Sequence, residues 1–294
     1  MRTSDVIKIV FLGCIWGGSF AFIRVSAPVI GAVWFTLGRL IVASLVLIAW
    51  ARWAGVDLSF RRYWKEYFVV GLLNTAGPWT LYAFAGKTIS ASYMSIINSS
   101  TPWMSAILGA WFLGEKMTVP KAIGLACGVL GVSLVAGWGP IAPTPEVLLA
   151  VFASILAALG YAVGGVAAKL YVKGVDSRAI AVGNTIFASL MMLPLLPEVP
   201  AASQWTSTVV ASMVIVGILS TGIGFPMYFQ LIKDVGATKA QTTTFIVPVS
   251  GVLLGVLFLG EPMKLTLIAG GLLILVACAL VLEIPLPGLR RRAK

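Results

Sequence analysis

One stretch of the sequence occurs twice, and this repeat constrains the fold more than any other feature. Residues 102–124 and 248–270 match at nine of 23 positions with a constant offset of 146 residues. Apolar identities arise easily by chance, but a proline, a Gly-Glu pair and an interior glycine in one register do not. The identical positions are Pro102/Pro248, Leu108/Leu254, Gly109/Gly255, Phe112/Phe258, Leu113/Leu259, Gly114/Gly260, Glu115/Glu261, Met117/Met263 and Gly124/Gly270. The repeat divides the chain into two related halves, 1–142 and 143–294.

Composition indicates that both halves lie in a membrane. Of the 294 residues, 59% are hydrophobic and only 11% are charged, whereas soluble domains carry about 25% charged residues. The apolar runs are about 20 residues long, enough for a helix to cross the hydrocarbon core of a bilayer. We therefore predict an all-α integral membrane protein with ten transmembrane helices. The predicted spans are 6–25, 30–51, 66–86, 90–113, 119–138, 147–170, 179–197, 206–231, 237–260 and 264–283.

The lysine and arginine residues determine the predicted orientation. With a cytoplasmic N-terminus, nearly all of the 21 Lys and Arg fall on the cytoplasmic side, and only Arg24, Lys87 and Lys264 fall outside. This bias explains the net charge of +11 without any binding to nucleic acid. Five predicted helices separate Glu115 from Glu261, an odd number, so the two halves are inverted relative to each other. Inverted repeats are typical of transporters that bind substrate near the midplane, between the repeats.

Several motifs resemble those of a known transporter family. The first helix carries WGGSF at 16–20 and then Arg24, and each half closes with a proline-centred helix, a Gly-Glu turn and a glycine-bearing helix. The chain resembles the drug/metabolite transporter superfamily, in its EamA-type branch of five plus five helices. The second half departs from this pattern, because Tyr161 and Lys169 stand where Trp16 and Arg24 align. More closely, the chain resembles bacterial exporters of aromatic amino acids, which implies amino acid export across the bacterial inner membrane.

Polar residues beside two mid-span prolines form the predicted substrate site. Pro102 and Pro248 free the carbonyl groups of Asn98 and Thr244, because proline has no N–H to donate. Hydroxyl and amide side chains precede both prolines, and at this depth they must face protein or a water-filled cavity. The alternative is a kink that serves packing alone, with the hydroxyls bonded to their own helix.

Aromatic side chains away from the span ends complete the predicted site, although ordinary core packing is their commoner role. The residues predicted to bind substrate are Trp16, Trp79, Tyr82, Asn98, Ser99, Thr101, Tyr161, Thr243 and Thr244. The predicted hinges are Pro78, Pro102, Pro226 and Pro248.

Charged residues give further hypotheses. Arg39 is the one clear charge inside a predicted span, and it either serves the site or extends to the outer interface. Glu115 and Glu261 are predicted to form turns by accepting hydrogen bonds from the first amide groups of the next helix. No acidic residue is predicted at a midplane and the chain has no histidine, so a facilitative carrier is favoured over proton-coupled drug efflux.

The same absence of histidine and of a mid-span carboxylate argues against a membrane enzyme. The three cysteines stand singly, so no metal site, disulfide or cofactor is expected. A nucleotide-sugar or phosphate-ester carrier is the alternative, but such anions need several buried cations. The favoured function is alternating-access export of a small zwitterion such as an amino acid, by a monomer in the bilayer.

Topology gives the first testable prediction. A cysteine placed at Pro143, in the predicted linker 138–146, should react with an impermeant thiol reagent added from outside. A cysteine in the basic loop 52–65 should react only from the cytoplasmic side. Labelling of the Pro143 position from the cytoplasm alone would contradict the inverted repeat.

Overall fold

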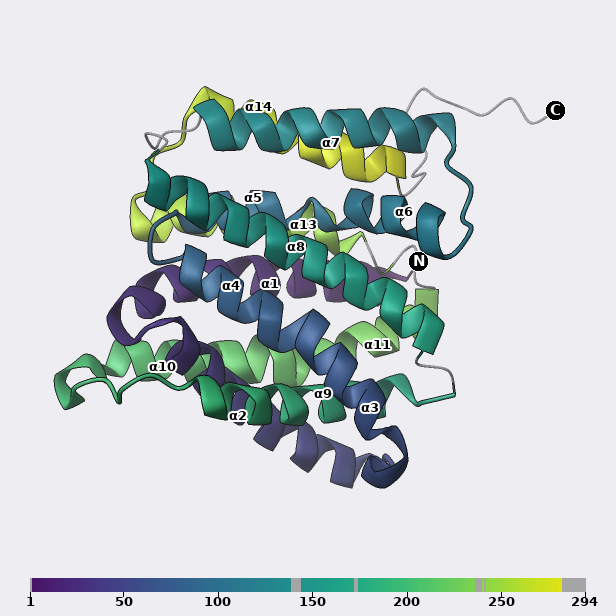
Figure 1. The fold of residues 1–294 in the computed structure, drawn as a ribbon, viewed down its shortest axis with the longest axis vertical. Helices are drawn as coiled ribbons and strands as arrows, with labels where there is room; N and C mark the ends of the chain where they lie inside the picture. Colours follow the sequence, from purple (N-terminus) through teal and green to yellow (C-terminus); the bar gives the residue numbers. More distant parts are fainter. Residues whose placement is uncertain (1, 139–143, 172–173, 236–239, 241, 282–294) are drawn as a thin grey trace.

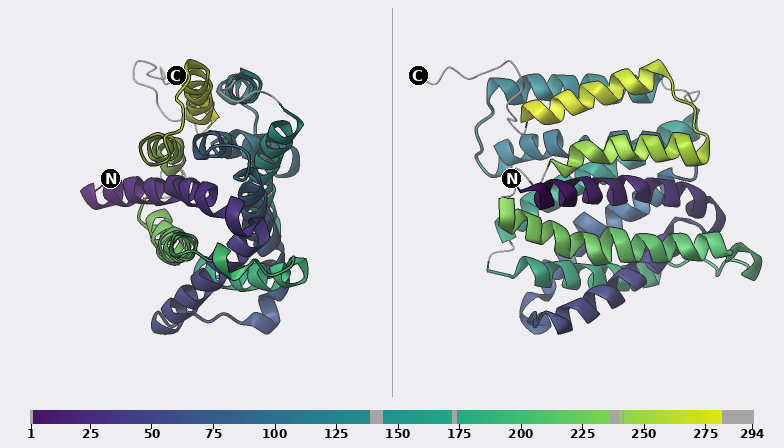
Figure 2. Two further views of the ribbon diagram at one scale, coloured as in Figure 1. Left: turned by 90° about the vertical axis from the view of Figure 1, so that its left-hand side faces the viewer. Right: turned by 180° about the vertical axis from the view of Figure 1, so that it is seen from behind.

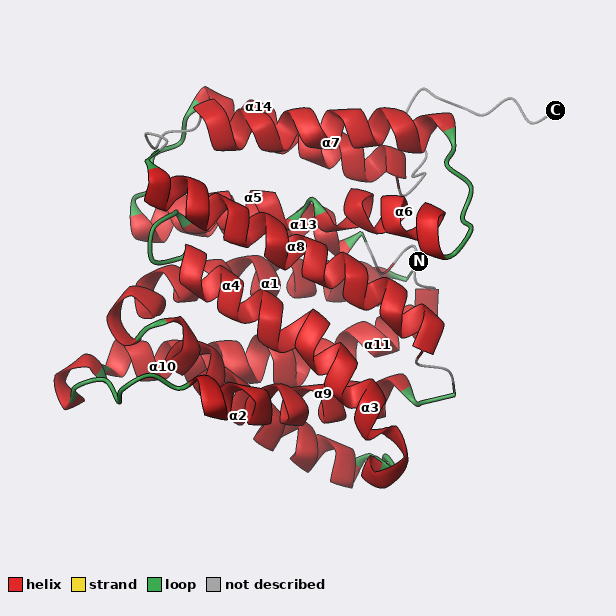
Figure 3. Ribbon diagram, viewed as in Figure 1, coloured by secondary structure: helices red, strands yellow, loops and turns green. Residues whose placement is uncertain are grey.

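Helices form all of the regular structure in the part of the chain that the computed structural model describes, which is residues 2–138, 144–171, 174–235, 240 and 242–281 (Figure 3). The first half contains α1 (Thr3–Ile30), α2 (Ala32–Trp53), α3 (Phe60–Gly71), the π-helix η1 (Leu72–Ala76), α4 (Gly77–Ala85), α5 (Ala91–Asn98), α6 (Thr101–Phe112) and α7 (Val119–Trp138). The second half contains α8 (Pro145–Tyr171), α9 (Ser177–Met192), two short 3₁₀ turns η2 (Leu193–Leu195) and η3 (Ala202–Gln204), α10 (Ser207–Ile215), the π-helix η4 (Val216–Ile223), α11 (Gly224–Val235), α13 (Thr243–Leu259) and α14 (Leu265–Val281).

These elements make the ten predicted helical crossings. Five described helices are long and apolar enough to cross a membrane by themselves, among them α1, α2 and α8. Other crossings consist of consecutive shorter elements, such as α3 with η1 and α4, or α5 with α6. The core of the predicted linker, the start of the ninth span and the end of the chain lie outside the described residues.

The helices run roughly parallel to one another and form a layered bundle (Figure 1). α7 and α14, the last helix of each half, pack together along one edge of it, and α2 and α3 lie near the opposite edge (Figures 1 and 2). The start of α1 and the end of α14 lie at the same end of the bundle, as both views in Figures 1 and 2 show. The last helices of the two halves therefore pair, and elements of both halves surround the centre.

α1 of the first half packs closely against α13 of the second half. A Cβ on Gly17 would lie 2.0 Å from Ser250 Oγ and 2.4 Å from the carbonyl oxygen of Val247. The Ser250 hydroxyl, in turn, donates a hydrogen bond of 2.8 Å to the carbonyl oxygen of Gly13. Small residues are used in this way where helices associate in lipid, since close packing and hydrogen bonds replace the hydrophobic effect there.

Three of the four prolines predicted as hinges adjoin an interruption of the α-helix. η1 directly precedes the turn that carries Pro78, and η4 directly precedes the one that carries Pro226. Between α5 and α6 the helix is interrupted just before Pro102. Pro248, by contrast, lies inside the continuous helix α13. The missing N–H of proline permits an interruption, and the surrounding contacts determine whether one forms.

The contact at Gly17 gives a stability prediction. Gly17→Ala should lower the melting temperature in detergent, because overpacking of this kind costs about 1–3 kcal/mol. Gly165→Ala is the matched control, since nothing lies within 4 Å of a Cβ added there. Alanine is favoured over glycine in a helix by about 1 kcal/mol, so the control should melt at the wild-type temperature or above it. Equal melting temperatures for both variants would contradict the close contact.

Candidate functional site

A cavity of about 430 Å³ lies between the two halves. Its lining comes from the middle of α1 and of α8 and from parts of α2, η1, α4, α5, α6, η4, α11 and α13. Eight of the nine residues predicted to bind substrate line it, namely Trp16, Trp79, Tyr82, Asn98, Thr101, Tyr161, Thr243 and Thr244. The structure therefore brings the two proline-adjacent polar segments and the deep aromatic residues to one place, although their role in binding stays a prediction.

Aromatic rings form a large part of the cavity wall, and they pack against one another across elements. Phe20 and Tyr82 meet edge to face with ring centroids 5.2 Å apart, and Tyr82 stacks on Tyr161 at 6.3 Å. Trp79 of α4 meets Phe225 of α11 at 6.4 Å. These contacts join elements of both halves and leave an apolar, aromatic surface facing the cavity.

The polar segment before Pro102 is only partly directed at the cavity. The Asn98 side chain lines it and its Oδ1 accepts a hydrogen bond of 3.1 Å from the Tyr82 hydroxyl. The carbonyl of Asn98, which Pro102 leaves without its helical donor, accepts from the Thr101 hydroxyl at 2.8 Å. The predicted kink with local back-bonding is thus present together with the cavity. The carbonyl that Pro102 frees therefore already has one donor from the protein.

Ser99 is the predicted site residue that does not line the cavity. Its side chain is buried and its hydroxyl donates to the carbonyl oxygen of Ser95 at 3.2 Å. Its own carbonyl accepts from the thiol of Cys278 in α14 at 2.9 Å. Ser99 therefore belongs to the contact between α5 and α14, on the side away from the cavity.

Two lining residues that were not predicted from the sequence come from the segment before Pro226. They are Ser220 and Phe225, and both belong to the stretch STGIGFP. The indole N–H of Trp16 donates to the carbonyl oxygen of Ser220 at 2.8 Å, and the Ser220 hydroxyl donates to that of Ile15 at 3.0 Å. The signal was available, because hydroxyl residues precede Pro226 just as they precede Pro102 and Pro248.

Arg39 lines the same cavity, so it does not extend to the outer interface. Its side chain is 5% exposed, and its guanidinium carbon lies 3.7 Å from the centroid of the Trp79 ring. Of the two readings left open by the sequence, the structure favours a place at the site.

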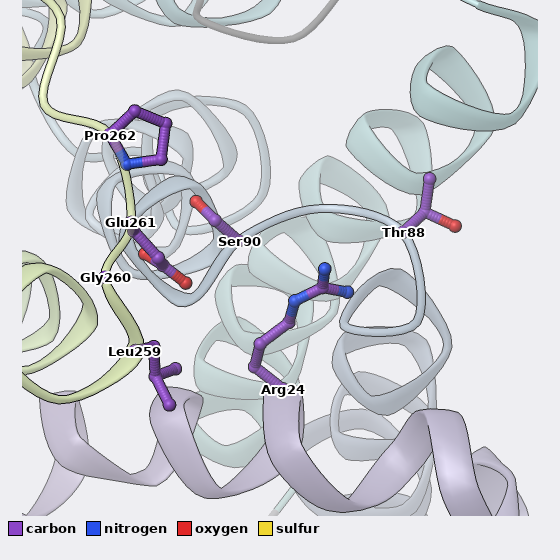
Figure 4. A pocket seen from close by; sticks show the side chains of 7 residues that line it. All are labelled: Arg24, Thr88, Ser90, Leu259, Gly260, Glu261 and Pro262. Atoms are coloured by element: carbon purple, nitrogen blue, oxygen red, sulfur yellow. The ribbon is translucent and has the colours of Figure 1, made fainter.

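A second cavity of about 400 Å³ lies near the end of α1, at the predicted outer side (Figure 4). Arg24 extends from α1 toward the loop that carries Thr88 and Ser90, and Glu261 lies across from it (Figure 4). The guanidinium of Arg24 donates to the backbone carbonyls of Gly86 and Lys87 at 2.9 and 3.0 Å. The charged groups of this second cavity, Arg24 and Glu261, already have protein partners, so it is a weaker candidate for the substrate site.

The prediction that Glu261 accepts hydrogen bonds from the first amide groups of the next helix is wrong. The Glu261 carboxylate accepts from the backbone N–H groups of Ala91 and Ser92 at 2.7 and 3.0 Å, and from the Ser92 hydroxyl at 2.6 Å. It caps the N-terminus of α5 in the other half, and not the helix that follows it in the chain. Glu115, its repeat partner, forms an ion pair of 3.0 Å with Lys169 of α8. Both glutamates therefore connect the halves, and neither lines the central cavity.

Comparison with known proteins identifies the architecture. The EamA-like transporter family matches residues 4–137 and 148–283, one copy in each half. The chain belongs to this family. It is accordingly a multi-pass membrane transporter and not an enzyme, and its two family units lie within the two halves that the repeat predicts.

Individual relatives are similar along most of the chain. YvbV of Bacillus subtilis, described as an uncharacterized transporter, is 27% identical over 288 residues, which cover 95% of this chain and 92% of that protein. A "Probable terminal-alkyne amino-acid exporter" of Streptantibioticus cattleyicolor is 26% identical over 259 residues, covering 87% of this chain and 86% of that one. A crystal structure shares the fold with a TM-score of 0.65 and 21% identity, covering 95% and 96% of the two chains.

We expect the same substitution, Glu to Gln, to change the melting temperature differently at the two repeat-related glutamates. Glu261→Gln should lower the melting temperature clearly, because it weakens charge-assisted hydrogen bonds worth about 1.5–3 kcal/mol each. Glu115→Gln should have little effect, since its ion pair with Lys169 is largely exposed and such pairs contribute about 0–1 kcal/mol. Thermal unfolding of both variants in detergent tests this, and equal losses would contradict the assigned cap.

Proposed function

We propose that the protein exports amino acids with aromatic or neutral side chains, together with related small metabolites. The observation that carries this proposal is the central cavity, in which seven of the 18 described lining residues are aromatic. Its volume of about 430 Å³ falls in the range of small-molecule sites, about 300–1,000 Å³. Hydroxyl and amide groups at Asn98, Thr101 and Thr244 supply a few polar contacts beside the aromatic wall.

The relatives support the same substrate class. The Streptantibioticus cattleyicolor protein is named a probable amino-acid exporter, and its similarity covers most of both chains. The resemblance to bacterial exporters of aromatic amino acids points the same way. Accordingly we place the protein in the bacterial inner membrane, as a monomer with both termini in the cytoplasm and with halves 1–142 and 143–294.

Transport by alternating access requires helices that change shape near the site. In our proposal Pro78, Pro102 and Pro226 serve as hinges, because each adjoins an interruption of its helix beside the cavity. Pro248 acts with them as a bend within α13. Movement of one half against the other then exposes the cavity to each side of the membrane in turn.

Energy coupling follows from the charges at the cavity. No Asp or Glu is among its described lining residues, and the chain has no histidine. A proton-coupled carrier needs a group that gains and loses a proton inside the membrane. Facilitated diffusion or exchange along the substrate's own gradient therefore fits better than proton-coupled drug efflux. With Arg39 as the single charged residue of the described lining, a nucleotide-sugar or phosphate ester fits less well too.

Flux through proteoliposomes tests the proposal. Purified protein should accelerate the release of labelled L-phenylalanine into substrate-free buffer, and an imposed pH gradient alone should cause no accumulation. Accumulation that collapses with a protonophore would contradict facilitated transport. Absence of flux for every member of a panel of aromatic and neutral amino acids would contradict the substrate class.

Adjacent residues supply a matched pair of variants for the same assay. Asn98→Ala removes a side chain that lines the cavity, and the loss of about 0.5–1.5 kcal/mol of hydrogen bonding should weaken transport about two- to tenfold. Thr244→Ala should act in the same direction. Ser99→Ala should leave flux unchanged, since Ser99 does not line the cavity. A loss with Ser99→Ala equal to that with Asn98→Ala would place the site elsewhere.

A further inference from the structure

The central cavity carries a single charged residue among its described lining residues, and that residue is Arg39. It sits on α2 in the interior of the bundle, with 5% of its side chain exposed. In the described part of the chain, ion pairs are found at Lys8–Asp234, Lys169–Glu115 and Arg178–Asp176, and none of them includes Arg39. Its Nε has no hydrogen-bond partner among the described residues. A buried cation without a counter-charge is costly, so such a group is retained where it has a function.

The stacking on Trp79 orients the guanidinium for binding an anion. A distance of 3.7 Å from the guanidinium carbon to the ring centroid places the planar group over the aromatic face. The N–H groups of a guanidinium point outward in its own plane, so stacking leaves them available. That planar fork matches the two oxygens of a carboxylate.

Close packing of the backbone holds Arg39 in place. A Cβ on Gly217 of η4 would lie 2.9 Å from the carbonyl oxygen of Arg39, and one on Gly38 would lie 2.2 Å from the sulfur of Met213. α2 is therefore seated directly against η4 and α10. A cation on such a fixed support is pre-organised for its ligand, which reduces the cost of binding.

From these observations we infer that Arg39 is the anchor for a substrate carboxylate, and that the carried solutes are small monocarboxylates with an aromatic or apolar body. This inference rests on the proposed function and deepens it. No described lining residue is acidic, so the described lining offers an ammonium group no charged partner comparable to Arg39. Amino acids are then recognised through their carboxylate, and the same acids without the amino group are ligands as well.

Ligand-induced stabilisation of the purified protein tests the anchor without requiring transport. The probes are L-phenylalanine, 3-phenylpropionate, which lacks the amino group, and 2-phenylethylamine, which lacks the carboxylate. At saturation the first two should raise the melting temperature by about 5 °C, and the amine should not raise it. Stabilisation by the amine equal to that by 3-phenylpropionate, or no stabilisation by either acid, would overturn the inference.

Variants locate the effect at one side chain. Arg39→Gln should remove the stabilisation by both acids, and Arg39→Lys, which keeps the charge but not the planar fork, should retain only part of it. Arg24→Gln is the matched control at the outer end, and it should respond to the acids as the wild type does. An undiminished response of Arg39→Gln would overturn the inference. If Arg39→Gln does not fold, the comparison of 3-phenylpropionate with 2-phenylethylamine on the wild-type protein still tests whether the carboxylate is the group that is bound.

The two proposals fail in different ways. If the acids stabilise the wild type through Arg39 but no flux is seen in proteoliposomes, the proposed transport is wrong and the anchor stands. If phenylalanine is carried but the amine competes with it as well as 3-phenylpropionate does, transport stands and the carboxylate anchor is wrong.

Discussion

The contact between α1 and α13 is the interaction on which the central cavity depends. Gly13 and Gly17 form one face of α1. That face lies against the Ile246 side chain at Gly13 and against the backbone of α13 at Gly17, too closely for a larger side chain at either position. Trp16 and Phe20 lie on the neighbouring face of the same helix and line the cavity. One helix thus presents glycines to the other half and aromatic rings to the site. Because hydrophobic burial does not drive helices together in lipid, this close packing and the Ser250 hydrogen bond help to hold the halves in register, together with the pairing of α7 with α14 and the Glu261 cap on α5.

Interrupted helices provide polar groups of the cavity, and the backbone carbonyls at the interruptions still have hydrogen-bond partners. Every backbone N–H and C=O within the bilayer core needs a partner from the protein. The carbonyl of Ser220, in the π-helix η4, accepts from the Trp16 indole, and the carbonyl of Asn98 accepts from Thr101. The aromatic and hydroxyl side chains around the cavity therefore both shape it and satisfy the backbone where the helices are interrupted.

The sequence predicted most of the architecture, because length, hydrophobicity and a repeated register are properties of the chain itself. Details that depend on neighbours distant in sequence were less accessible. Asn98 lines the cavity and Ser99 does not, since adjacent helical residues point about 100° apart and only the packing of α5 shows which of them faces inward. Glu261 caps α5, far from it in the chain, and no local spacing indicates that partner. The place of Arg39 was undecided for the same reason, since it depends on Trp79 from another helix.

The repeated prolines show how two similar halves acquire different local structures. Two serines, Ser99 and Ser100, stand where the equivalent positions before Pro248 hold Phe245 and Ile246. The Ser99 hydroxyl donates to the carbonyl oxygen of Ser95. Bonds of this kind compete with the hydrogen bonds of the helix, and the helix is interrupted at Ser99 and Ser100. Ile246 instead packs against α1 near Gly13, and α13 continues through its proline. Proline removes the same hydrogen bond in both halves. The residues before each proline therefore determine whether the helix that lines the cavity is interrupted or continuous.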